Sequence, residues 1–218
     1  MKLAQAGRSM VEMLGVLAII GVLSVGGIAG YSKAMTKYKL NKQSEQLNQI
    51  FNTAVRYYGQ IRYPESTGST LITNIFVNMG EIPKEMVRTT TKTNNLIYDV
   101  FNNSVKISVY GDKYDNGQSW NPVGSMIIQI GLSSGEDELN AQICRNIINI
   151  AKENHHGLWY FETISGSGTD RVQTTYWGDR FCSGSSCITA LTLTKIDAMC
   201  RGFVAKNHKN KNFNLWIK

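Results

Sequence analysis

The sequence predicts an α+β fold, in which one long N-terminal α-helix packs on a mainly antiparallel β-sheet head stapled by disulfides. Three observations support this prediction. An uncharged apolar run near the N-terminus passes without a helix breaker into an amphipathic stretch. Short segments of alternating hydrophobicity, which are typical of strands, follow it. All four cysteines lie in the second half of the chain.

The first expected element is an apolar helix long enough to cross a bilayer. Residues 13–32 carry no charge over 20 positions. At about 1.5 Å of rise per residue this run covers roughly 30 Å, the thickness of a hydrocarbon core. Glu12 lies at its leading edge, and because a carboxylate is costly in lipid, we expect it to be paired, shielded or close to the headgroups. From these residues alone, an ordinary anchor with Glu12 at its aqueous end is an equally good interpretation.

The helix is expected to continue past the membrane. No proline or glycine lies between Lys33 and Tyr58. Apolar residues recur there at the spacings of an amphipathic helix: Leu47, Ile50, Phe51, Ala54, Val55 and Tyr58. Joined to the apolar run, this gives one helix of about 50 residues.

The N-terminus resembles a known class of signal. A short leader ends at Gly7, Glu12 follows five residues later, and the apolar helix contains scattered glycines. This pattern resembles the class III signal peptide of type IV pilins and pseudopilins. The resemblance implies cleavage after Gly7 by a prepilin peptidase, methylation of the new N-terminus at Arg8, and filament assembly through the helix. Arg8 departs from the pattern, because mature chains of these families usually begin with an apolar residue.

The same resemblance implies a role for Glu12 in assembly. Its carboxylate would pair with the positive N-terminus of a neighbouring subunit, so that two charges are neutralised together in an apolar core. The alternative is a local pair with Arg8, four residues earlier, worth about 0.2–0.5 kcal/mol. We favour the intersubunit role on the strength of the resemblance. The implied partners are other copies of this chain and other pilins, a prepilin peptidase, an inner-membrane assembly platform and membrane lipid.

The expected organisation is a leader (1–7), an apolar transmembrane and assembly helix (8–32), its amphipathic continuation (33–58) and an α+β head (59–218). Lysines just after the apolar run favour a cytoplasmic head by the positive-inside rule. The leader and the cysteines favour an oxidising compartment. We therefore expect a single-pass protein of the bacterial inner membrane with a periplasmic head, later part of an extracellular pilus.

Within the head, alternating apolar residues around Asn102-Asn103 predict a hairpin, and residues 126–130 predict a central strand. Hydroxyls followed by carboxylates at 133–137 indicate a capping-box start for a helix. Residues 71–77 fit a helix or a strand. We also expect strands at 158–164 and 188–193, a loop at 165–168, a short helix opening at 194–197, and an edge strand in the basic tail, 206–218.

Cysteines at 144, 182, 187 and 200 allow three pairings. The absence of a Cys-x-x-Cys pair argues against zinc, and the spacing of Cys182 and Cys187 suits a small disulfide loop. The order of strand, cysteine-bearing helix and late cysteine is similar to the C-terminal region of type IVb pilins. That resemblance implies a bond between Cys144 and Cys200, whose loop closure contributes about 4 kcal/mol by chain entropy.

Catalytic and metal-binding signals are weak. The sequence has no nucleophile elbow, phosphate-binding loop or His-Glu-x-x-His, so neither enzyme activity nor a cofactor is expected. Asp112, Asp115 and Asn116 lie in a turn that lacks the bidentate glutamate of a calcium loop, so a plain turn is favoured. His155 and His156 are expected to form a solvated helix cap, and no metal site is expected.

Together these features predict a type IV pilin-like subunit of the type IVb branch, a major or minor component serving adhesion, motility or DNA transfer. A pseudopilin of a type II secretion system uses the same signal and is the first alternative. A DNA-binding minor pilin for uptake or conjugation is the second, because the net charge is +7 and the pI is near 9.2. The positive charge is spread along the chain, which favours a solvated basic surface over nucleic acid.

Overall fold

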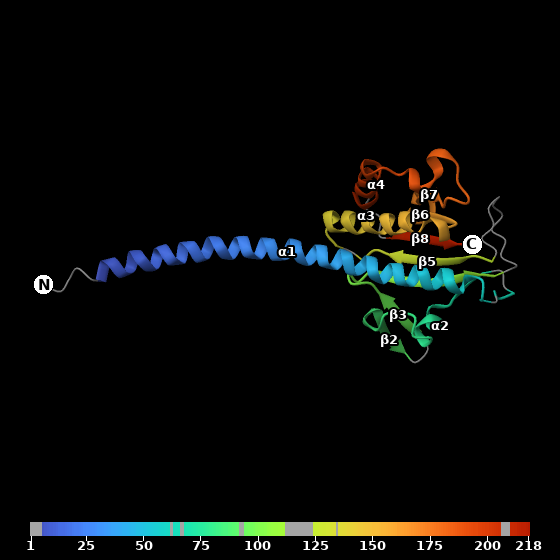
Figure 1. Ribbon diagram of the computed structural model, residues 1–218, viewed down its shortest axis with the longest axis horizontal. Coiled ribbons are helices and arrows are strands. Elements are labelled where there is room, and N and C mark those ends of the chain that lie inside the picture. Colours follow the sequence, from blue (N-terminus) through green and yellow to red (C-terminus); the bar gives the residue numbers. More distant parts are fainter. Residues whose placement is uncertain are drawn as a thin grey trace. The chain divides into compact units, whose positions relative to one another are not determined.

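The computed structural model describes residues 6–61, 63–65, 68–91, 94–111, 124–133, 135–205 and 210–218. The side chains of 6–9, 89–91, 94 and 95 are outside this description. The chain divides into two compact units, Met1–Asn41 and Lys42–Lys218. Helix α1 (Ala6–Tyr58) belongs to both, because the division falls within it (Figure 1).

Helix α1 confirms the predicted single long helix, at 53 residues. It is uninterrupted because the apolar and the amphipathic stretches both lack proline. In the second unit its apolar stripe is buried, with Leu47, Ile50, Phe51 and Ala54 each less than 5% exposed. The helix ends at Tyr58, and Gly59 and Gln60 form the turn that follows.

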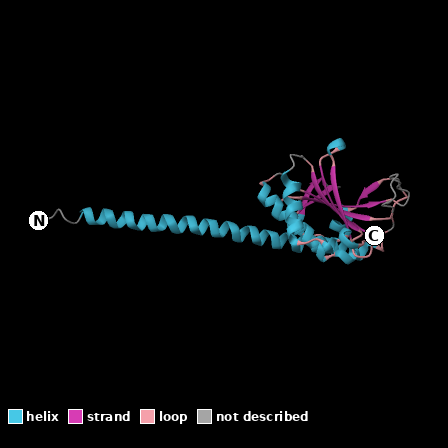
Figure 2. Ribbon diagram, turned by 90° about the horizontal axis from the view of Figure 1, so that it is seen from above, coloured by secondary structure: helices cyan, strands magenta, loops and turns pink. Residues whose placement is uncertain are grey.

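In the described part of the second unit the strands, magenta in Figure 2, form one sheet. Every pairing between its named strands is antiparallel, as predicted. Among the described residues the strand order is β2-β3-β4-β5-β8-β6-β7, with β1 paired to β4. The strands are β1 (Ser69–Leu71), β2 (Val87–Thr91), β3 (Asn94–Tyr98), β4 (Ser104–Tyr110), β5 (Met126–Gly131), β6 (Tyr160–Ser165), β7 (Val172–Trp177) and β8 (Lys211–Ile217).

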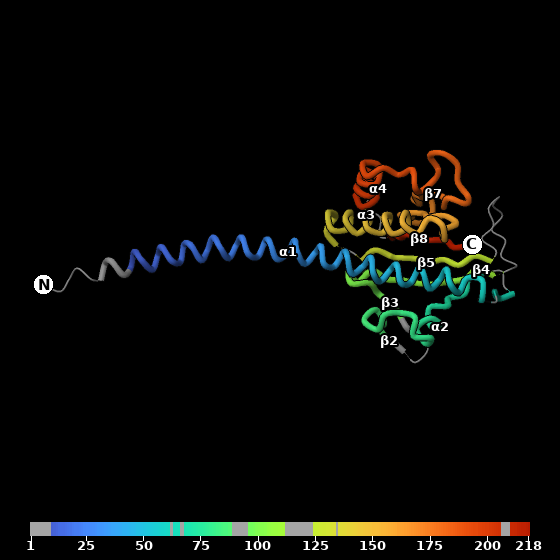
Figure 3. Tube along the Cα trace, viewed as in Figure 1, coloured from blue at the N-terminus to red at the C-terminus, as the bar shows by residue number. Residues whose placement is uncertain are grey.

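The described part of the second unit also contains the helices α2 (Thr73–Asn78), α3 (Asp137–Glu153) and α4 (Leu193–Ala205). The trace in Figure 3 shows α4 beside α3. Short 3-10 turns connect the elements at η1 (Lys84–Met86), η2 (His155–Gly157), η3 (Gly168–Asp170), η4 (Gly184–Ser186) and η5 (Ile188–Ala190).

The sheet buries side chains on both faces. On one face the alternating β4 residues Val105, Ile107 and Val109 join the helices in the main core. On the other face an aromatic cluster gathers around Ile127: Trp159, Tyr160 and Trp216, with Tyr110 and Trp177 packed against it. Burial of both faces explains why β5 is apolar at nearly every position instead of alternating.

Several predicted elements are confirmed and several are corrected. The hairpin joins β3 to β4, and Asn102 takes the positive φ of 67° that its turn requires. Residues 71–77 contain both alternatives, since β1 ends at Leu71 and α2 begins at Thr73. The expected edge strand is wrong in position, because β8 lies inside the sheet between β5 and β6.

The predicted strand at 188–193 is also wrong. Ile188 and Leu191 are buried at a spacing of three, which suits the 3-10 turn η5. On the side away from β8, β6 pairs with β7 instead, whose mostly polar sequence showed no apolar alternation. Ser133 does not cap α3, because it hydrogen-bonds to Phe101 and Asn103 while Glu136 precedes α3 without a side-chain cap. The other predicted hydroxyl, that of Ser134, lies outside the described residues.

Candidate assembly helix and the contacts that fix it to the head

In the first unit, α1 exposes apolar side chains around its whole circumference. Between Met10 and Ile28 the exposed fractions of its large apolar residues run from 52% at Ile20 to 75% at Val22. In the described part of the chain, α1 is the helix long and apolar enough to cross a membrane. Such a helix is a membrane anchor or a signal segment.

The glycines of this segment have no packing role within the described chain. A Cβ added at Gly15, Gly21, Gly26, Gly27 or Gly30 would meet nothing within 4 Å. Each glycine weakens an aqueous helix by about 1 kcal/mol relative to alanine. In membranes, small residues instead allow helices to approach closely. The glycines are therefore suited to contacts with other helices.

The predicted processing and assembly residues all lie in this helix. Gly7 and Arg8 are in its first turn, where only the backbone is described. Glu12 follows and is exposed. Their roles in cleavage, methylation and subunit pairing stay predictions.

In the second unit, a buried polar network ties α1 to the β3–β4 turn and to α3. Gln43 donates from Nε2 to Oδ2 of Asp99 at 2.5 Å, and its Oε1 accepts from Nδ2 of Asn146 at 2.8 Å. Oδ1 of Asp99 accepts the backbone N–H groups of Phe101 and Asn103, each at 2.9 Å. One glutamine thus holds the helix to two other elements.

Asn103 extends the network from Asp99 to Ser133. The side-chain amide of Asn103 donates to Oδ2 of Asp99 at 2.9 Å, and its oxygen accepts the N–H of Ser133 at 2.9 Å. Gln43, Asp99 and Asn103 are all buried. Burial raises the pKa of Asp99, although hydrogen bonds from Gln43 and Asn103 oppose this shift. Buried polar groups whose partners are all present favour one arrangement of the elements they join.

A second set of polar contacts fixes the end of α1 to the segment after α2. Glu81 accepts from Arg56 at 2.5 Å and from the hydroxyl of Tyr57 at 2.9 Å. The hydrogen bond to Glu81, together with partial burial, raises the pKa of Tyr57. The Tyr57 ring also packs edge-on against Phe76 of α2, with 5.8 Å between centroids. The apolar stripe of α1 is therefore flanked by polar contacts.

The two disulfides join Cys144 to Cys200 and Cys182 to Cys187, with Cα–Cα distances of 5.7 and 5.0 Å. The first pair is the one implied by the resemblance, and the second is the one favoured by spacing. Cys144 lies on α3 and Cys200 on α4, so that this bond staples the two helices. The small second loop encloses η4.

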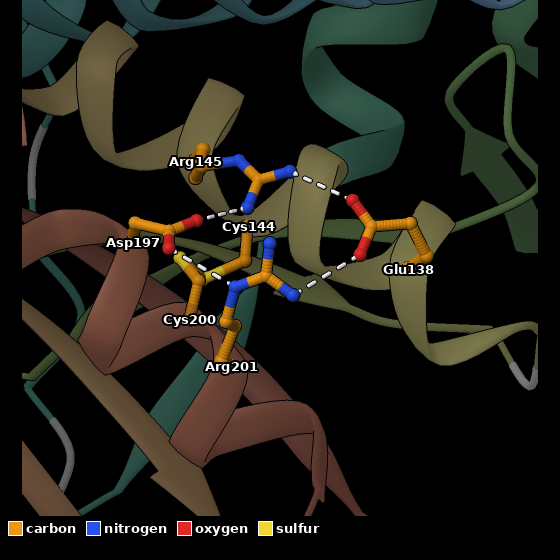
Figure 4. A network of polar contacts seen from close by, with 6 residues as sticks. All are labelled: Glu138, Cys144, Arg145, Asp197, Cys200 and Arg201. Carbon is orange, nitrogen blue, oxygen red and sulfur yellow. Dashed lines mark hydrogen bonds and ion pairs between the residues drawn. A yellow bond between two sulfur atoms is a disulfide. The ribbon is translucent and has the colours of Figure 1, made fainter. Parts of the chain in front are cut away.

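Four charged side chains surround the first disulfide (Figure 4). Arg145 of α3 pairs with Glu138 at 3.3 Å and with Asp197 of α4. Arg201 of α4 pairs with Asp197 at 3.0 Å and with Glu138 at 3.3 Å. Hydrogen bonds from these arginines lower the pKa of Glu138 and of Asp197. The covalent staple and the ion pairs thus connect the same two helices.

The two adjacent histidines differ from the prediction of a solvated cap. Asn154, not a histidine, follows α3 as its C-cap. His156 is exposed, but His155 is largely covered, and Asp179 from the segment after β7 lies against both. Sequence reasoning missed Asp179 because it is 23 positions away from His156 and no short motif connects them. The candidate calcium turn at Asp112 lies outside the described residues.

No protein-family model matches the chain, and a search of curated proteins found no match. The architecture itself is pilin-like. It combines a long, apolar N-terminal helix with a head in which the second half of that helix packs on an antiparallel sheet and disulfides staple the C-terminal region.

Proposed function

We propose that this protein is a structural subunit of a type IV pilus of the IVb kind, anchored in the bacterial inner membrane and assembled into a filament through α1. One observation carries the proposal. The same helix is apolar and exposed on all sides between residues 10 and 28, yet buried along one stripe in a disulfide-stapled head from residue 47 onward.

The first half of α1 requires a partner outside the chain. Contiguous apolar surface of this extent is unfavourable in water, so it is expected to lie in lipid or against other helices. A membrane satisfies it before assembly, and identical helices satisfy it afterwards. The five glycines would allow those helices to pack closely.

Glu12 provides the sharpest test. We expect Glu12→Ala to reach the membrane fraction at the normal level and to give little or no sedimentable filament. The matched control is Glu153→Ala, which removes an exposed carboxylate at the end of α3 and should leave filament yield unchanged. Normal filament yield from Glu12→Ala would contradict the pairing of this carboxylate with a neighbouring N-terminus.

Mass spectrometry of the membrane-extracted protein tests processing. The proposal requires a mature chain that begins at Arg8, and the structure places all four cysteines in disulfides. A native chain that keeps residues 1–7, or one that has lost the apolar half of α1, would contradict a pilin or pseudopilin role. Methylation of Arg8 is measured in the same spectrum.

The net charge of +7 supports one second candidate, a minor pilin that captures DNA. Its signature is duplex DNA binding by the purified protein that weakens steeply as salt is raised, because the phosphates would release counterions. Binding that does not depend on salt, or no binding, would leave the basic surface as a solvated one. A pseudopilin would share the helix and its processing but would yield no long surface filament at native expression.

A further inference from the structure

We propose that His155, His156 and Asp179 form a binding site for a divalent transition metal ion of the zinc class. The site lies entirely within the second unit, apart in sequence from the proposed assembly residues of the first unit. It is also chemically distinct from the turn at 112–116, because it offers two imidazole nitrogens and one carboxylate instead of oxygen atoms alone.

The ligand atoms already converge. Nδ1 of His156 lies 2.5 Å from Oδ2 of Asp179, and Nδ1 of His155 lies 3.3 Å from the same oxygen. One potential ligand atom from each of the three residues lies within 4.8 Å of those of the other two. Ligands of tetrahedral zinc, at about 2.0–2.2 Å from the ion, are about 3.3–3.5 Å apart. The His155–Asp179 spacing fits this geometry without change.

The remaining spacing can adjust at low cost. His156 must move its nitrogen away from Asp179 by a fraction of an ångström to admit an ion. Its side chain is 78% exposed, whereas that of His155 is 22% exposed. His155 is thus the covered ligand and His156 the exposed one, with 3.8 Å between the centroids of their rings. Solvent has direct access to the site through His156, and water can supply a fourth ligand.

His155 provides an independent indication of a ligand. Its Nδ1 is buried and makes no hydrogen bond within the described part of the chain, although the Asp179 carboxylate is near. A buried nitrogen without a hydrogen bond is unfavourable, by about 1–3 kcal/mol in typical cases. A metal ion between His155 and Asp179 would give that nitrogen a partner.

The backbone is shaped to bring Asp179 to the histidines. Gly178 donates its N–H to the carbonyl of Trp159 at 2.9 Å. A Cβ on Gly178 would lie 1.9 Å from the carbonyl oxygen of Leu158 and 2.8 Å from that of His155. Only glycine permits this approach, so the segment after β7 touches the η2 turn at the residue before Asp179.

The three side chains are of the types that bind zinc, since histidine coordinates it through a neutral imidazole nitrogen and aspartate through its carboxylate. Because a metal ion competes with protons for the imidazole nitrogens, its affinity should fall on acidification.

The bound ion would connect two segments whose backbones already lie close together at Gly178. One is η2, directly after α3, and the other lies between β7 and the Cys182–Cys187 loop. An ion here would add a third cross-link to the two disulfides. The ion would stabilise η2 and the segment before the Cys182–Cys187 loop against unfolding.

The test uses the full chain in detergent with its disulfides intact, stripped with a chelator that is then dialysed away. Titration with ZnCl₂ in a calorimeter should show one ion per chain, and zinc should raise the midpoint of thermal unfolding in a saturable way. We expect His156→Gln and Asp179→Asn each to weaken binding by more than about tenfold, since even the loss of a residue that hydrogen-bonds to a metal ligand weakens binding about 10–100-fold.

Asp170→Asn is the matched control, because it removes an exposed carboxylate from the η3 turn and should bind zinc like the wild type. His156 is exposed, so His156→Gln should unfold at the wild-type midpoint without metal and keeps the test valid if Asp179→Asn folds poorly. No binding by the wild type, or equal binding by wild type and His156→Gln, would overturn the proposal.

Discussion

Between residues 10 and 28, α1 carries apolar side chains on every face, whereas between residues 47 and 54 it carries one buried stripe flanked by polar residues with partners in the head. The backbone is the same uninterrupted helix in both halves. The two halves of α1 therefore differ in which of their apolar side chains the rest of the chain covers. The apolar stripe of the second half is buried within this chain, whereas the apolar side chains between residues 10 and 28 are exposed in the described structure.

The comparison also separates two uses of polar residues. In the second half, Gln43 and Tyr57 have partners inside the described head, which fix the position of the helix. In the first half, Glu12 is exposed on an apolar helix. A carboxylate in such surroundings is costly unless an external partner neutralises it. It is therefore a candidate for specifying which neighbour is accepted.

The largest expected effect comes from removing the Cys144–Cys200 disulfide, which joins α3 to α4 in the head. Replacing Cys144 and Cys200 together by serine should lower the free energy of unfolding of the head by about 4 kcal/mol, against about 2 kcal/mol for Cys182 and Cys187, because the closed loop is longer. Urea unfolding followed by tryptophan fluorescence measures this, since all four tryptophans belong to residues 59–218. Equal losses for the two pairs would contradict the loop-length argument.

A matched pair of substitutions tests the comparison directly. Ile50→Ala, at a fully buried position, should cost about 3 kcal/mol in the same unfolding experiment because it leaves a cavity. Ile20→Ala makes the same change at an exposed position and should leave the unfolding of the head within about 0.5 kcal/mol of wild type. If both variants lost the same stability, the two halves would not be energetically distinct.

Asp99→Asn tests how much the hydrogen bonds around Asp99 contribute to holding the second half of α1 in the head. Both oxygens of Asp99 accept hydrogen bonds, so an amide nitrogen in either place would face donors from Gln43 or Asn103. The expected cost is about 2 kcal/mol at neutral pH. Asp170→Asn serves as the control, and a variant as stable as wild type would show that the network can rearrange.

The difference in unfolding free energy between wild type and Asp99→Asn should depend on pH. Because burial raises the pKa of Asp99 in the folded state, the stability linked to its protonation is complete below the unfolded pKa and is lost as the pH rises through the folded pKa. Wild type should therefore gain stability relative to Asp99→Asn as the solution is acidified. Parallel urea unfolding of the two proteins at neutral and mildly acidic pH measures the widening gap.

The smallest expected effect is at the ion pairs beside the first disulfide. Arg201→Ala should lower the thermal midpoint slightly at low salt and hardly at all at high salt, because its pairs are exposed and screened. The pKa values of Glu138 and Asp197 are lowered in the fold. Their stabilisation is present above the unfolded pKa values and lost as the pH falls through the folded ones, so the variant should match wild type in acid.

Much of the fold could be predicted from local patterns. The unbroken helix, the β3–β4 hairpin and the strand at 126–130 follow from periodicity and turn residues that lie close together in the chain. Strand β7 could not be predicted, because it is an edge strand without a fully buried residue that would impose apolar alternation. The position of β8 was missed because a terminal, basic segment gives no sign that strands will lie on both sides of it.

The sequence by itself therefore determined the fold class: a long N-terminal helix, apolar in its first half and amphipathic in its second, followed by a cysteine-containing α+β head. Only the tertiary structure decided which distant side chains meet, as Gln43 meets Asp99 and Asn146, and as Asp179 meets His155. The physical reason is the separation along the chain of the residues that interact. Helix and strand periodicity are set by neighbouring residues, whereas contacts across the chain depend on how the finished elements pack.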